Sequence, residues 1–159
     1  MYSGQIYSGK RDPAPLLDAL LLLQARYSNL SQMMEVLFYG WNLDQLKHQV
    51  DRLSLQDVVK VNAAKPRKEI LSLQQSVDAL IFLDWNDPNV NGVLTGKLFE
   101  YFFAGKPIIG IGSTSDSAAG KLMMDLRVGY PAGNSVDTIA NLIGEILGGQ
   151  LLEYRPQDE

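Results

Sequence analysis

A strand–helix–strand unit is predicted for residues 79–111, whose sequence is ALIFLDWNDPNVNGVLTGKLFEYFFAGKPIIGI. It opens on Ala79 to Leu83, an apolar run typical of a central parallel strand, because both faces of such a strand are buried. A long loop follows from Asp84 to Thr95, and the pattern predicts a helix from Gly96 to Ala104. A second apolar strand, Ile108 to Ile111, closes the unit. Two strands joined through a helix in this way pair in parallel.

The same alternation of short β-rich runs and longer helical stretches continues on both sides of this unit. The further predicted strands are Met1 to Tyr7, Glu35 to Tyr39, Asp57 to Asn62 and Val128 to Tyr130. The further predicted helices are Pro13 to Asn29, Asn42 to Leu53, Pro66 to Val77, Ser115 or Asp116 to Leu126, and Val136 to Leu147. Six strands alternating with six helices predict an α/β fold with a doubly wound, parallel, six-stranded, Rossmann-like sheet.

Composition sets limits on the class of protein. The 159 residues fit a single domain, 1–159, and contain no cysteine, which excludes disulfides, cysteine-based metal sites and thiol catalysis. The net charge of −4 is the wrong sign for a general nucleic-acid binder. Residues 1–70 carry +2 and residues 71–159 carry −6, so an anion site is expected to draw on the first part. No apolar run reaches the roughly 20 residues of a membrane span, and the single histidine, His48, is expected at the surface.

Ligands of doubly wound sheets bind beyond the carboxyl ends of the strands. The loop after the first predicted strand places a glycine, Gly9, and two adjacent cations, Lys10 and Arg11, just before a helix. Backbone amides, the helix dipole and two cations together favour an anion such as phosphate. A solvated turn with ordinary surface cations is the alternative, and the sequence leaves both open.

The helix after the fourth strand carries a second candidate group. Lys97 and Glu100 are three residues apart and therefore share one helical face. A carboxylate at this place could accept hydrogen bonds from a ribose diol, or it could form only a surface ion pair with the lysine. The neighbouring Phe99, Phe102 and Phe103 are predicted to serve in packing rather than to stack on a base.

Residues 97–109, KLFEYFFAGKPII, resemble the signature of the C-terminal domain of GT-B retaining glycosyltransferases, the group 1 or family 4 glycosyl transferases. Two other segments fit the same family. Residues 4–10, GQIYSGK, resemble its first strand and loop, and Arg67 lies in a segment similar to the one after its third strand. The resemblance covers essentially the whole chain, and it implies the C-terminal half of a GT-B fold.

The resemblance also implies roles for individual residues. Lys10 would neutralise the diphosphate of a nucleotide-sugar donor, Glu100 would bind the ribose hydroxyls, and Arg67 would border the nucleobase. The diphosphate site as a whole is predicted to comprise Gly9, Lys10, Arg11, Thr95, Gly96 and Lys97. The chain departs from the family twice: the family's diphosphate arginine is Gln5 here, and the family's sugar-contacting glutamate falls on Gly92. Lys10 or Arg11 would then carry more of the charge.

The function expected from this resemblance is nucleotide-sugar binding within a glycosyltransferase. The sugar would pass to a glycan, lipid or other acceptor, in bacterial surface polysaccharide synthesis. No metal or other cofactor is expected. The acceptor site and any catalytic residue would lie on an N-terminal domain outside this chain, so we expect the 159 residues alone to be inactive and the active face to be cytoplasmic. Two alternatives stay open: a flavodoxin- or receiver-like interaction module, and half of a nucleotide-sugar epimerase.

Overall fold

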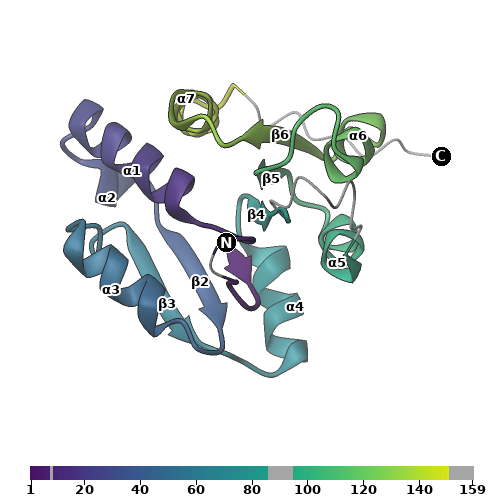
Figure 1. Ribbon diagram of the computed structural model, residues 1–159, viewed down its shortest axis with the longest axis horizontal. Coiled ribbons are helices and arrows are strands. Elements are labelled where there is room, and N and C mark those ends of the chain that lie inside the picture. Colours follow the sequence, from purple (N-terminus) through teal and green to yellow (C-terminus); the bar gives the residue numbers. More distant parts are fainter. Residues whose placement is uncertain (8, 86–94, 151–159) are drawn as a thin grey trace.

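The computed structural model describes residues 1–7, 9–85 and 95–150. It contains six strands: β1 (Tyr2–Ser3), β2 (Val36–Gly40), β3 (Val59–Ala63), β4 (Leu80–Leu83), β5 (Ile108–Ile111) and β6 (Gly129–Gly133). The helices within the described residues are α1 (Ala14–Arg26), α2 (Leu30–Met33), α3 (Asp44–Arg52), α4 (Arg67–Ser76), α5 (Gly96–Ala104), α6 (Ala118–Asp125) and α7 (Val136–Leu147). Strands and helices alternate as predicted, except that a second short helix, α2, stands between α1 and β2 (Figure 1).

The strands form two parallel three-stranded ladders, β1-β2-β3 and β4-β5-β6. Met1 joins them, because its nitrogen donates to Ala79 O at 2.9 Å and its oxygen accepts from Ile81 N at 2.8 Å. These two hydrogen bonds are the pair that a parallel ladder makes around one residue, here Leu80. The spatial order is therefore 3-2-1-4-5-6, the doubly wound order, and the strand order reverses between β1 and β4. The predicted fold class is confirmed.

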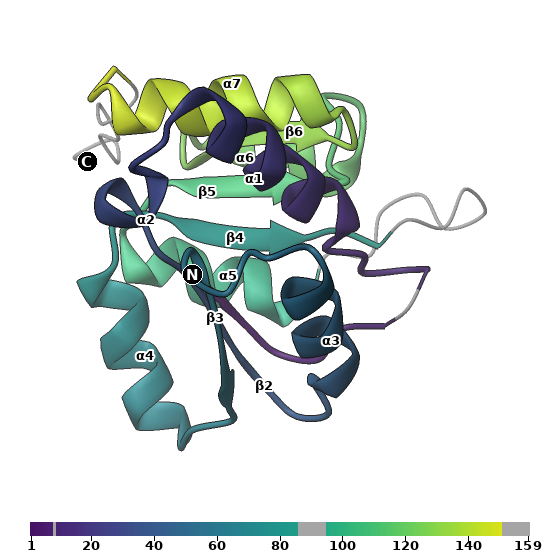
Figure 2. The same cartoon turned by 90° about the vertical axis from the view of Figure 1, so that its left-hand side faces the viewer.

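Helices cover both faces of the sheet, and each face has its own apolar cluster. One cluster joins α1, α3 and α7 to the sheet, with Leu20, Val50 and Ile139 among its buried members. The other joins α4, α5 and α6, with Tyr101 and Met123 fully buried. Figures 1 and 2 show the two layers of helices on opposite sides of the sheet.

Several predicted boundaries were wrong. The first strand, predicted as Met1 to Tyr7, ends at Ser3 because Gly4 takes a φ of +141° and turns the chain out of the sheet. The helix predicted over Pro13 to Asn29 ends at Arg26, and the short helix α2, which was not predicted, follows it. Asn42 does not cap α3, since its φ of +55° is left-handed.

The cap of α6 lies one or two residues later than predicted. Ser117 accepts from Gly120 N at 3.1 Å, in place of Ser115 or Asp116.

Candidate functional site

The candidate site lies at the carboxyl ends of β1 and β4, where the two strands separate, and we call this region the crevice. Beyond Met1 no ladder bond between the two strands is present in the described chain, and the Lys97 amine of α5 donates to the Ser3 carbonyl instead. The amine lies 5.6 Å from the Tyr2 ring centre and 5.7 Å from that of Tyr101. Lys97 therefore marks the point at which the strand order reverses, where doubly wound folds bind ligands.

The charge of Lys97 is set by its surroundings. Burial lowers the pKa of the Lys97 amine, the Glu100 carboxylate counteracts this by attraction, and Arg11 lowers the pKa further by repulsion. Arg11 also acts on Tyr2, whose pKa burial raises to about 12 and Arg11 partly lowers. The loop after β1 and the start of α5 therefore interact electrostatically across the crevice.

Glu100 lies on the same side of α5, and it does not form the ion pair with Lys97 that the sequence left open as an alternative to ribose binding. Its Oε2 is 3.3 Å from Arg67 Nη2, and its Oε1 accepts from Gln74 Nε2 at 2.7 Å. The carboxylate is largely buried and Arg67 is largely exposed. The structure thus joins two residues that the sequence assigned separately, to the ribose and to the nucleobase.

Beneath Glu100 lies a buried polar network that the sequence did not indicate. Gln74 is fully buried and also donates to Ser3 Oγ at 3.2 Å, while Ser3 N donates to the Tyr101 hydroxyl at 3.3 Å. Burial raises the pKa of Tyr101, so the hydroxyl stays protonated. Gln74 lies within a polar helical run, so periodicity gave no signal for it. This network ties α4 and α5 to β1 and fixes the Glu100 carboxylate.

Gly9, Lys10 and Arg11 form a tight turn before α1. Gly9 has a φ of +73°, and the Lys10 and Arg11 amides both donate to Tyr7 O. Lys10 is exposed and Arg11 is half-buried. Lys10 Nζ lies 4.8 Å from the Trp85 ring centre, and the Arg11 guanidinium carbon lies 5.7 Å from it. The structure therefore brings the two cations to the start of the loop after β4.

Thr95 and Gly96 begin α5, as predicted. Thr95 occupies the N-cap position, and its buried Oγ1 has no hydrogen-bond partner in the described parts of the chain. A Cβ built on Gly96 would meet no heavy atom within 4 Å, so the backbone there is open to a ligand. The prediction about Gly92 lies outside the described residues.

Packing of the phenylalanines of α5 is confirmed for two of the three. Phe102 packs against the apolar cluster of its layer, and Phe99, 45% exposed, packs edge-on against Phe102 at 5.8 Å between ring centres, whereas Phe103 is 87% exposed. The sheet covers only one stripe of α5, and Leu98 and Tyr101 fill it. His48 is exposed, as predicted.

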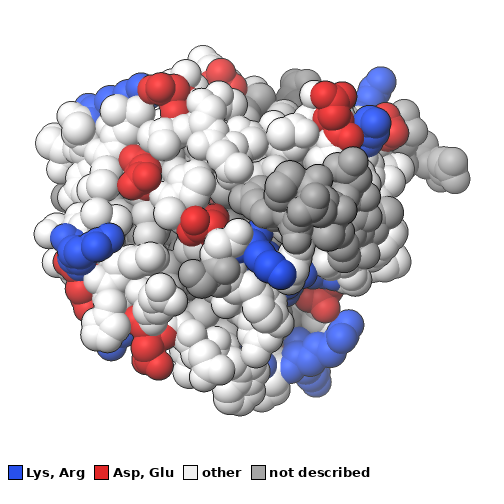
Figure 3. All heavy atoms as spheres, viewed as in Figure 1, with Lys and Arg blue, Asp and Glu red and all other residues white. Residues whose placement is uncertain are grey.

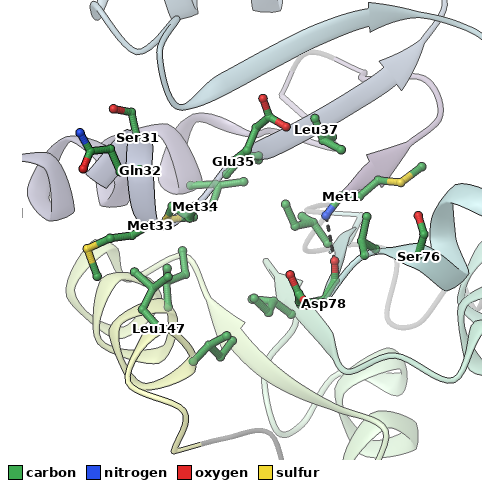
Figure 4. A pocket seen from close by; sticks show the side chains of 18 residues that line it. Met1, Ser31, Gln32, Met33, Met34, Glu35, Leu37, Ser76, Asp78 and Leu147 are labelled. Atoms are coloured by element: carbon green, nitrogen blue, oxygen red, sulfur yellow. Dashed lines mark hydrogen bonds between the residues drawn. The ribbon is translucent and has the colours of Figure 1, made fainter. Parts of the chain in front are cut away.

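A separate pocket of about 660 Å³ lies at the opposite edge of the sheet (Figure 4). Its walls are mostly apolar and include Met33, Met34 and Leu147, with Glu35 and Asp78 at the side. Since it lies by the amino ends of β2 and β4, it is remote from the crevice. None of the predicted site residues lines it.

Surface charge is mixed. In Figure 3, basic and acidic side chains are interspersed over the visible face and form no single basic patch. Among residues 1–7, 9–85 and 95–150, no cluster of three or more His, Cys, Asp or Glu side chains could hold a metal ion. Within the same ranges, no helix has the length and apolar character needed to cross a bilayer.

Comparison with solved structures identifies the fold. The chain matches a glycosyltransferase from Rickettsia africae with a TM-score of 0.70 at 17% identity, over 96% of this chain and 39% of that one. The chain has the fold of the C-terminal half of a GT-B protein. WaaG, a glycosyltransferase involved in lipopolysaccharide biosynthesis, matches with a TM-score of 0.65 at 13% identity, over 96% of this chain and 40% of WaaG.

The same GT-B half occurs in epimerases. UDP-GlcNAc 2-epimerase from Neisseria meningitidis, bound to UDP-GlcNAc, matches with a TM-score of 0.64 at 13% identity, over 99% of this chain and 38% of that one. The chain thus spans about two fifths of the length of these structures. No family model matches the chain, and no curated protein matches it in sequence.

Proposed function

We propose that this domain binds a nucleotide sugar and supplies the donor site of a glycosyltransferase. The observation that carries the proposal is the crevice between β1 and β4. Lys10, Arg11 and Lys97 approach it from the loop after β1 and from α5, and the Glu100 carboxylate lies one helical turn beyond Lys97. Cations beside a carboxylate suit a ligand that has a diphosphate next to a ribose diol.

In this proposal each residue binds one part of the nucleotide sugar. Glu100, held by Gln74, accepts hydrogen bonds from the ribose hydroxyls, and Arg67 lies beside the base. Lys10 and Arg11 bind the diphosphate together with the open backbone at Thr95 and Gly96. Lys97 adds positive potential from within the crevice.

Transfer breaks the bond between the anomeric carbon and the diphosphate oxygen. Negative charge grows on the departing diphosphate, and fixed cations stabilise that charge more strongly than they stabilise the bound donor. We propose that Lys10 and Arg11 provide this stabilisation and that the donor site needs no metal or other cofactor. Attack on the anomeric carbon would come from an acceptor, a glycan or a lipid, held by a second domain. Because nucleotide sugars are cytosolic, we place the active face in the cytoplasm.

Calorimetry with UDP-GlcNAc and GDP-mannose tests the binding. We expect weak binding of one donor to the 159-residue chain, and roughly a tenfold loss of affinity in Glu100→Ala, because charge-assisted hydrogen bonds to the ribose are removed. Glu145→Ala removes an exposed carboxylate on α7 and serves as the matched control. No heat of binding at millimolar donor, with the wild type as silent as Glu100→Ala, would refute the proposal.

An epimerase is the second candidate, because UDP-GlcNAc 2-epimerases share this half of the fold. Both candidates need the nucleotide-sugar site, and they differ in what the second domain contributes. Incubation of a chain that includes the proposed second domain with UDP-GlcNAc alone distinguishes them. A new UDP-sugar in the absence of acceptor would support epimerisation, while turnover only with acceptor would support transfer. An interaction module without ligand binding is disfavoured by the two cations that follow β1.

A further inference from the structure

Trp85 lies at the edge of the crevice and has a defined backbone position. Its amide donates to Asp84 Oδ1 at 2.8 Å, and Asp84 Oδ2 accepts from the fully buried Ser113 at 2.8 Å. The Asp84 amide donates in turn to Ile111 O at 2.9 Å. Asp84 thus ties the first residues after β4 to the loop after β5, and these hydrogen bonds fix the backbone position from which the Trp85 side chain projects.

The half-buried Trp85 ring is surrounded by residues of the loop after β1. Lys10 Nζ lies 4.8 Å and the Arg11 guanidinium carbon 5.7 Å from its ring centre, and the Tyr7 ring is tilted against it at 5.8 Å between centres. The two cations that we assign to the diphosphate therefore rest on an aromatic ring. Charge-assisted hydrogen bonds to phosphate are stronger than cation–π contacts at exposed rings, so a diphosphate would draw both cations away from Trp85.

The groups along the crevice follow an order. Arg67 forms an ion pair with Glu100, and the Glu100 carboxylate attracts the Lys97 amine. Lys97 and Arg11 repel each other, and the Arg11 guanidinium lies over the Trp85 ring. A nucleotide sugar has its parts in a matching order: base, ribose, diphosphate, sugar. With the ribose at Glu100 and the diphosphate at Arg11, the sugar comes next to the Trp85 ring.

We propose that Trp85 is the surface on which the sugar ring of the donor packs, and that Lys10 and Arg11 cover this surface until the diphosphate binds them. The proposal rests on the proposed function and adds the sugar subsite to it. One face of a pyranose ring carries mainly C–H groups, and such a face packs well on the flat apolar surface of an indole. The subsite uses a residue that the sequence analysis did not single out.

The test compares each nucleoside diphosphate with its own sugar, using UDP against UDP-GlcNAc and GDP against GDP-mannose. Calorimetry is carried out on wild type, Trp85→Ala, Trp85→Leu and Trp41→Phe. Trp41 is 69% exposed in the loop after β2, so its replacement is the matched control. We expect both Trp85 variants to lose about tenfold in affinity for the nucleotide sugar and less than twofold for the nucleoside diphosphate. Trp85→Leu keeps an apolar side chain, and circular dichroism establishes that each variant is folded. If Trp85→Ala does not fold, the fluorescence experiment, which keeps the Trp85 ring, tests the proposal.

Fluorescence gives an independent readout, because Trp41→Phe leaves Trp85 as the single tryptophan. We expect the nucleoside diphosphate to increase quenching of Trp85 by acrylamide, as the cations leave the ring, and the nucleotide sugar to decrease it. If both ligands bind and Trp85 affects them equally, or neither changes the quenching, the sugar subsite is refuted while the proposed function stands. If neither ligand binds the wild type, the proposed function fails, and this inference fails with it.

Discussion

Replacing Gln74 by glutamate should destabilise the fold by about 3 kcal/mol near neutral pH. Gln74 is fully buried, and its Nε2 donates to Glu100 Oε1 at 2.7 Å. The substitution keeps the shape of the side chain but replaces this donor with a second carboxyl group at hydrogen-bond distance from the first. Two carboxylates so close do not both ionise readily, and a pKa raised by about 2 units corresponds to roughly 3 kcal/mol. Arg67 compensates little, since its side chain is largely exposed.

The sign of the pH dependence follows from the raised pKa in the folded state of Gln74→Glu. Below about pH 4 the introduced carboxyl is protonated in the folded and the unfolded chain, so its ionisation adds no cost there. As the pH rises, the unfolded chain releases the proton first, and the free energy of unfolding falls until the folded-state pKa is passed. The loss is therefore largest at neutral and alkaline pH, and part of the stability returns on acidification.

Urea and thermal unfolding of Gln74→Glu across this pH range measures the effect. A loss of about 3 kcal/mol corresponds to a drop in Tm of roughly 6–12 °C for a chain of this size. Gln75→Glu places the same charge one residue along the same helix, where the side chain is exposed, and should change Tm by little. Equal Tm values for the two variants at neutral pH would show that the Gln74–Glu100 contact does not hold the carboxylate as described.

Three further predictions concern stability. Gly120→Ala should destabilise by more than about 1 kcal/mol, because a Cβ there would run into Thr114 O. Gly144→Ala in α7 should stabilise by about 0.5–1 kcal/mol, because its Cβ would meet only the Tyr27 hydroxyl, at an ordinary contact distance of 3.9 Å. Denaturant titration checks both, and a stable Gly120→Ala would contradict the packing. Because burial lowers the pKa of Lys97, the folded lysine loses its proton at a lower pH than the unfolded one, so the wild type should gain stability relative to Lys97→Met as pH rises toward 10.5. A difference in the free energy of unfolding that stays constant with pH would count against a buried amine. Burial raises the pKa of Tyr2 to about 12, so the stability that the protonated hydroxyl contributes should be complete below pH 10 and lost as pH rises toward 12. Alkaline unfolding curves measure this loss, and it should be smaller in Tyr2→Phe, which has no hydroxyl to ionise.

Several features could be predicted from the sequence because they depend on local pattern. The bounds of α5, β5 and α7 match the predicted ranges, since each element has a clear apolar period and a clear start or stop. The prediction failed where tertiary contacts overrode that pattern. β1 is shorter than its predicted range, and Gly4 and the Lys97 bond to Ser3 O end its ladder with β4.

The predicted site residues are separated along the chain, and the chemistry of each one could be predicted from its residue type and local pattern. Lys10, Lys97 and Glu100 were predicted from charge and helical spacing together with a family resemblance. Their partners could not be predicted, because a pair such as Arg67 and Glu100 requires two helices to be packed side by side. Gln74 and Trp85 were missed because nothing in their local sequence marks them. Gln74 is a polar residue in a polar run, and Trp85 lies at the end of a strand without a motif.

By itself, then, the sequence determined the alternating α/β pattern, the placement of the cations after β1 and the carboxylate on α5. Apolar periodicity and loop composition are local properties of the chain, so they can be read without coordinates. Only the tertiary structure decided that Lys97 turns into the crevice between β1 and β4, that Glu100 is held by Gln74, and that Lys10 and Arg11 rest on Trp85. Those contacts join residues distant in sequence, and they form only when the two halves of the sheet pair at Met1 and bring the strand ends together.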